Sequence, residues 1–409
     1  MKRILLLALL MSFASADMRE IKRKRTTLRE GPGAYYMAIA ELQEGQKVSI
    51  IQDDDQWPQV KVQNLQGYVS AKAFIGKPAA AETTMDPFAA MAGGPTPSTE
   101  ISNAGVSAAV KGFAERFGKR LKTDPNFLEQ VMGYQVDPRL YETFRKTTYG
   151  DNNPRKIHRR FDLPELPEDR SFTFVEEGSG IAIAAKLASI GLVNDRNLIA
   201  YVNYVGHHVA ESSHGYDIPF RFFILDSEKV NGYACPGGIV FITRGALEIM
   251  ENEAQLASFL GHEIAHVVYR HGMQEMEERK EMIIAGSAFD ELNRKAPLED
   301  EMEKTVVQLE DAFMDAYETI FAGRLADYEV EADAVGLVYA ARAGYDPREL
   351  LALLKNFERS GRFAENEHYS ASANALRMQR VEKLIDDNRQ MRKAKGLQTF
   401  EQRFKTYVK

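Results

Sequence analysis

The stretch that decides the fold is NEAQLASFLGHEIAHVVYRHG, residues 252–272, which contains an HExxH motif at His262, Glu263 and His266. An α-helix turns roughly 100° per residue, so two histidines four positions apart project from one face toward a single point. Glu263 lies roughly 100° further round, beside that point and not on it. This spacing predicts a divalent metal held by His262 and His266, with Glu263 as the base that activates an attacking water.

A catalytic zinc ion takes a third protein ligand and keeps one position open for water. The segment YEVEAD, residues 328–333, offers carboxylates on a predicted helix that stops at Gly344. Glu329 and Asp333 are four apart and share a face, whereas Glu331 points nearly the opposite way and is expected to be solvated. The shared face can place Glu329 on the metal and Asp333 behind a histidine ligand.

The order NGYACPGG, HEIAH and EVEAD, within about residues 172–380, resembles the HtpX-like and BepA-like zinc metallopeptidases. These belong to a gluzincin family that also includes the prenyl-protein proteases. The resemblance implies a zinc ion on His262, His266 and Glu329, with Asp333 supporting a histidine. It also implies a mainly helical zincin-type core with a small β-sheet.

Two further features come with this resemblance. Pro236, Gly237 and Gly238 correspond to the edge strand on which an extended peptide substrate pairs. His368 corresponds to a histidine that reaches the metal or the oxyanion of the transition state, although the proline expected after it is missing and Arg380 comes later than usual. The family pattern therefore adds His368 to Glu263 as a candidate catalytic residue.

Other residues near the motif have simpler interpretations. His271 is five positions after His266, about 140° off the ligand face, and is expected to be structural. The single cysteine, Cys235, cannot form an internal disulfide and is expected to be a small buried residue. His207 and His208 are expected in packing or at the surface.

The elements before the motif indicate an α+β order. Residues 178–192 and 195–212 have the composition of two helices, and residues 220–225 and 238–242 have that of two strands. Residues 231–237 are predicted to form the turn between those strands.

Residues 17–77 form a separate predicted domain. The turn cluster LREGPG, the strand GQKVSII, Trp57 and the closing segment GYVSAKAF resemble, in that order, a bacterial SH3-type domain. This implies a small all-β barrel, and such modules bind cell-wall peptide or protein segments. Trp57 is equally compatible with a place in the core and with a place in a binding surface.

The remaining segments predict the export of the chain and its division into domains. Residues 1–16 have the charged start, apolar stretch and Ala-Ser-Ala ending of a signal peptide, so export to the periplasm or the cell exterior is expected. Residues 78–104 are rich in Ala, Pro, Gly, Ser and Thr and read as a flexible linker. Residues 105–409 are the predicted metallopeptidase domain, with helical extensions at both ends.

Composition limits the partners. The net charge of −7 argues against nucleic acid, and the apolar stretches after residue 16 are too short for a transmembrane span. The sequence thus predicts an exported zinc endopeptidase that cleaves polypeptides, including unfolded or misassembled envelope proteins. Three alternatives remain. One is a chaperone-like binding protein whose partner is chosen by the SH3-like domain, and another is a latent peptidase with His368 as a fourth zinc ligand. The third is a cell-wall-associated protein whose main function lies in the N-terminal module.

Overall fold

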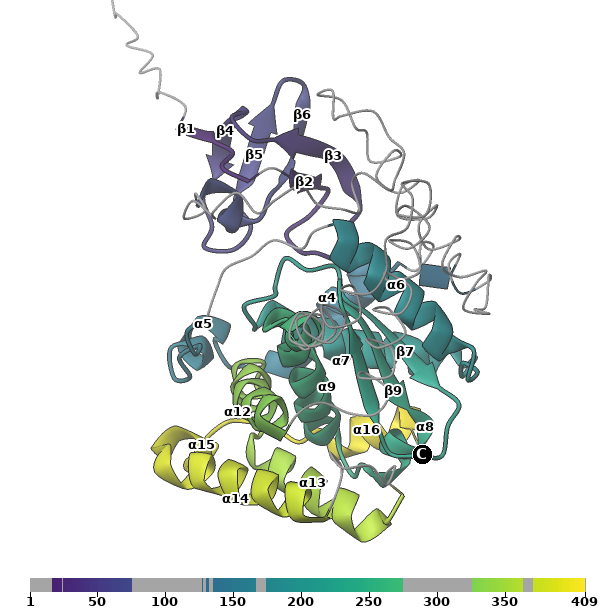
Figure 1. Cartoon of the computed structure of the whole chain (residues 1–409). Coiled ribbons are helices and arrows are strands. Elements are labelled where there is room, and N and C mark those ends of the chain that lie inside the picture. Colours follow the sequence, from purple (N-terminus) through teal and green to yellow (C-terminus); the bar gives the residue numbers. More distant parts are fainter. Residues whose placement is uncertain are drawn as a thin grey trace, which may run out of the picture. The chain divides into compact units, whose positions relative to one another are not determined.

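The computed structural model forms two compact units that divide after residue 82 (Figure 1). It describes residues 17–23, 25–75, 127, 130–131, 135–166, 174–274, 326–362 and 371–408. The predicted signal peptide and linker, and almost all of residues 105–134, lie outside these ranges. The domain boundaries therefore stay predictions, while the α+β fold class is confirmed.

The first unit is a six-stranded antiparallel sheet with the order β1-β4-β5-β6-β2-β3. Its elements are β1 (Met18–Glu20), β2 (Arg25–Arg29), β3 (Ala38–Gln43), β4 (Lys47–Gln52), β5 (Gln59–Val62), β6 (Leu65–Tyr68) and the 3-10 helix η1 (Ala71–Phe74). Short β-branched runs form these strands because alternate side chains enter one apolar core, which includes Val48, Val60 and Val69. Trp57 is 7% exposed, which favours its place in the core.

The second unit contains a three-stranded sheet with the order β7-β9-β8. Strands β7 (Arg221–Leu225) and β9 (Ile239–Thr243) are parallel, and β8 (Gly232–Cys235) runs antiparallel to β9 at the sheet edge. The two predicted strands are confirmed. The prediction of a plain turn over residues 231–237 is wrong, because four of those residues form β8.

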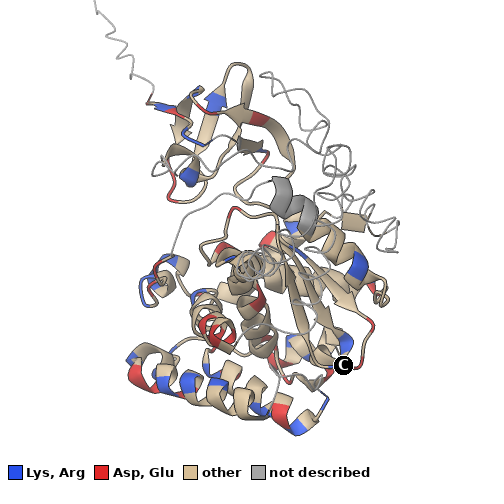
Figure 2. Ribbon diagram, viewed as in Figure 1, with Lys and Arg blue, Asp and Glu red and all other residues tan. Residues whose placement is uncertain are grey.

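Helices cover both faces of this sheet (Figure 1). On one face, Phe223, Phe241 and Cys235 share an apolar cluster with Ile183 and Leu187 of α6 (Phe174–Ala188). On the other face lie α7 (Arg196–Glu211) and α9 (Glu253–Val268). The strands are almost free of charged residues, as a sheet buried on both faces requires (Figure 2).

The remaining helices complete the second unit. They are α4 (Pro138–Tyr149), α5 (Pro154–His158), α8 (Arg244–Ile249), α12 (Ala326–Arg342), α13 (Arg348–Ser360), α14 (Ala371–Asp387), α15 (Arg389–Lys393) and α16 (Glu401–Val408). Among them, α12, α13 and α16 pack against α9. Side-chain caps fix several starts: Asn252 accepts the N–H of Gln255 at α9, and Asp195 accepts those of Asn197 and Leu198 at α7. None of the described helices is both long and apolar enough to cross a membrane.

The helices α9 and α12 cross at two glycines. A Cβ on Gly261 would lie 2.7 Å from the Gly336 carbonyl oxygen, and a Cβ on Gly336 would lie 2.5 Å from the His262 amide nitrogen. Both positions exclude any side chain, so the two backbones touch where HExxH begins. The close approach of α12 therefore explains the glycine before His262.

This crossing predicts that Gly336→Ala destabilises the protein. Helix propensity alone would stabilise it by about 1 kcal/mol. Overpacking against α9 should instead lower the free energy of unfolding by about 1–3 kcal/mol, as measured by urea denaturation. The control Ala334→Gly, on the same helix, should cost about 1 kcal/mol through propensity. An unchanged or higher stability for Gly336→Ala would show that the helices are not in contact here.

Candidate metal centre

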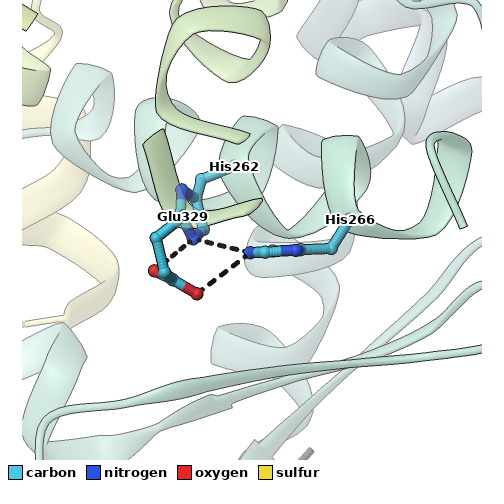
Figure 3. Close-up of side chains that lie close together, drawn as sticks. All are labelled: His262, His266 and Glu329. Carbon is cyan, nitrogen blue, oxygen red and sulfur yellow. Dashed lines mark hydrogen bonds and ion pairs between the residues drawn. The ribbon is translucent and has the colours of Figure 1, made fainter. Parts of the chain in front are cut away.

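Three buried side chains converge where α9 crosses α12 (Figure 3). His262 and His266 project from α9 and Glu329 from the first turn of α12. Their exposed fractions are 6%, 3% and 3%, and their candidate ligand atoms lie within 4.8 Å of one another. The structure thus brings the predicted ligands together, and their role as metal ligands stays a prediction.

The spacing and chemistry of these atoms fit a zinc ion. The two Nε2 atoms are 3.0 Å apart, and they lie 3.4 and 3.3 Å from the nearer Glu329 oxygens. Ligands at zinc distances in a tetrahedron are separated by about 3.3 Å along each edge. Two imidazole nitrogens and one carboxylate oxygen are also a donor set that zinc accepts while one position stays open.

The far nitrogens of both histidines are fixed by hydrogen bonds. The Nδ1 of His262 lies 2.9 Å from Asp333 Oδ1, and the Nδ1 of His266 lies 2.8 Å from the Nδ1 of His271. With a proton on Nδ1, each Nε2 is left with its lone pair facing the centre. The sequence prediction placed Asp333 here but not His271.

Arg377 of α14 joins the two acidic groups of the centre. Its Nη1 lies 2.9 Å from Glu329 Oε2, and it donates to Asp333 from Nε at 2.7 Å and from Nη2 at 2.8 Å. Sequence analysis missed this residue because the family pattern drew attention to Arg380, which the structure leaves exposed on the same helix. No spacing rule singled out Arg377.

The electrostatics of the cluster favour a cation. Burial opposes ionisation of Glu329, yet Arg377 and His262 hold the pKa of that carboxyl well below its usual range. Against the effect of burial, Glu329 and Asp333 raise the pKa of His262 to about 10. The two buried carboxylates thus stay anionic and attract positive charge, and the raised pKa of His262 is one expression of that attraction.

Glu263 lies next to this point, facing the sheet edge. It lines a cavity together with His262, Phe259 and Gly232, and it is 5% exposed. A Cβ on Gly232 would lie 2.3 Å from Glu263 Oε1, so the glycine leaves room for the carboxylate in its present position. Asp333 and Arg377 also line the cavity, and residues of α13 such as Leu353 and Phe357 give it an apolar side.

The segment Pro236-Gly237-Gly238 forms the tight turn between β8 and β9. Gly237 and Gly238 have φ of 82° and 98°, values that favour glycine, so the turn explains both glycines without a substrate. The sheet edge that could pair with a peptide is β8 itself. The role of Pro236, Gly237 and Gly238 in substrate binding stays a prediction.

Other histidines divide into two groups. His207 and His208 are buried in packing, and burial lowers the pKa of each to about 3; His208 Nε2 lies 2.8 Å from the Ala343 carbonyl oxygen. His368 lies outside the described residues, so its catalytic or gating role stays a prediction.

Comparison with known proteins agrees with this geometry. Residues 198–385, from α7 to α14, match the profile of peptidase family M48. These residues are thus similar to peptidase family M48. Residues 24–75 match the bacterial SH3 domain, so the family resemblances of both parts of the chain are confirmed.

Two relatives of the M48 domain are informative. The Beta-barrel assembly-enhancing protease of Escherichia coli strain K12 is 28% identical over 187 residues, which are 43% of this chain and 36% of that protein. The Mitochondrial metalloendopeptidase OMA1 of Arabidopsis thaliana is 27% identical over 139 residues, 34% of this chain and 26% of that protein. The matches thus span well under half the length of either relative.

The contacts of Arg377 predict a metal-linked stability effect. Arg377→Gln leaves Glu329 and Asp333 with uncompensated buried charge, which should lower the free energy of unfolding by about 3 kcal/mol in chelator. Zinc would neutralise part of that charge, so the loss should shrink when zinc is added. Denaturant unfolding with EDTA and with zinc checks this. The exposed control Arg380→Gln should change stability by less than about 0.5 kcal/mol, and equal losses for both variants would contradict the assignment.

Proposed function

We propose that this protein is an exported zinc endopeptidase. The observation that carries the proposal is the buried triangle of His262, His266 and Glu329 beside Glu263, at a cavity bordered by an edge strand. The match of residues 198–385 to peptidase family M48 and the names of the relatives support peptide hydrolysis.

Each part of the centre has a place in this chemistry. A zinc ion held by His262, His266 and Glu329 would polarise the scissile carbonyl and lower the pKa of water. Glu263 would accept a proton from the attacking water and deliver it to the leaving amine nitrogen as the C–N bond breaks. Asp333 would keep His262 in the tautomer that binds through Nε2, and β8 would align the extended substrate.

The proposed substrate class rests on the predicted signal peptide and on the name of one relative. The predicted signal peptide supports export from the cytoplasm, and the relative from Escherichia coli is named for enhancing β-barrel assembly. We therefore propose unfolded or misassembled envelope proteins as substrates. The SH3 domain would add a cell-wall peptide or a protein segment as a partner, and its own ligand stays a prediction.

The first test is cleavage of casein by the chain from residue 17 and by its Glu263→Gln variant, with zinc measured on both. Both proteins should hold about one zinc per chain, because Glu263 is not a ligand. The variant should cleave at least about 100-fold more slowly, because it lacks the base. Glu329→Gln, in contrast, should lose zinc.

Other outcomes separate the alternatives. Zinc on both proteins with no cleavage by either would favour the latent or chaperone-like protein, and His368→Ala would then restore cleavage only if His368 blocks the metal. Absence of zinc from both would refute the site.

A further inference from the structure

A chain of hydrogen bonds leads from His266 to the surface of α12. His271 Nδ1 lies 2.8 Å from His266 Nδ1, and His271 Nε2 lies 3.1 Å from Glu331 Oε2. The side chain of His271 is 1% exposed and that of Glu331 is 44% exposed. The His271 ring also stacks on Tyr328, with centroids 4.6 Å apart and an angle of 22°.

The backbone makes this contact possible. In a continuous helix His271 would point about 140° away from His266. The helix α9 instead ends at Val268, and Arg270 adopts a left-handed conformation with φ of 58°. A positive φ is uncommon outside glycine and has an energetic cost. Here it turns the chain so that His271 comes back beneath His266.

We propose that His271 is a positioning residue that orients His266 for the metal and is itself oriented by Glu331. A single arrangement of protons satisfies every hydrogen bond from His266 through His271 to Glu331. If His266 binds metal through Nε2, its proton lies on Nδ1 and is donated to His271 Nδ1. His271 then carries its own proton on Nε2 and donates it to Glu331. One tautomer of each ring satisfies both contacts.

The two histidine ligands are therefore supported differently. His262 is backed directly by the buried carboxylate of Asp333, which Arg377 also contacts. His266 is backed by an imidazole, with its carboxylate one residue further out and half exposed. Both outer supports, Glu331 and Asp333, come from the same helix as Glu329. The motif on α12 thus contributes one metal ligand and the support of both histidines.

The inference rests on the proposed zinc site, and its test measures the metal directly. The variant His271→Phe keeps an aromatic ring against Tyr328 but removes the acceptor for His266. The dissociation constant for zinc, from competition with a chromophoric chelator, should rise about 10- to 100-fold. The absorption spectrum of the cobalt-substituted protein should also change, because the orientation of His266 is no longer fixed.

Two variants extend the series. His271→Gln offers a side-chain oxygen to His266 and an N–H to Glu331, so it should recover part of the lost affinity. Glu331→Gln keeps an acceptor for His271 without the charge and should weaken zinc binding only a few-fold. The matched control is His214→Phe, which removes another histidine contact to α12, at 2.9 Å from the Tyr339 hydroxyl. It should leave zinc affinity unchanged.

The outcomes are distinct. Unchanged zinc affinity and an unchanged cobalt spectrum in folded His271→Phe would overturn the inference while leaving the proposed peptidase intact. If His271→Phe does not fold, the His271→Gln variant decides. A cobalt spectrum and a zinc affinity close to those of the wild-type protein would support the proposal. A zinc affinity no better than that of a His266→Ala protein would overturn it. Failure of the wild-type chain to bind zinc would refute both the inference and the proposed function.

Discussion

The close crossing of α9 and α12 is the constraint on which the metal centre depends. HExxH can align two histidines on one helix, but a third ligand must come from another helix at a fixed distance. Gly261 and Gly336 let the two backbones touch beside His262, which places Glu329 and Asp333 over the histidines. A larger side chain at either position would separate the helices and open the triangle of ligands.

The buried charges of the centre follow from that geometry. Bringing two carboxylates into an apolar interior is costly unless cations accompany them. Arg377 supplies one from α14, and a bound zinc ion would supply the other. The helix α14 therefore has a role beyond packing, because its Arg377 holds Glu329 and Asp333 in place.

The predictions from sequence succeeded where local periodicity carries the information. The helix with HExxH, the helix before Gly344, the helix over residues 195–212 and the strands at β7 and β9 all appear as expected. Pairing Glu329 with Asp333, and separating them from Glu331, needed only helical spacing. The strand β8 was missed because residues 232–235 are short and lie next to two turn glycines, so they have the composition of a loop.

By itself, the sequence predicted the type of centre: two histidines and a glutamate with the donor chemistry of zinc, and a second glutamate expected to act as a base. Tertiary structure alone decided what surrounds them. Arg377 enters from a helix more than a hundred residues after HExxH, and His271 returns to His266 only because Arg270 leaves the helical conformation. Neither contact follows from local spacing, since one depends on how helices pack and the other on a single backbone dihedral.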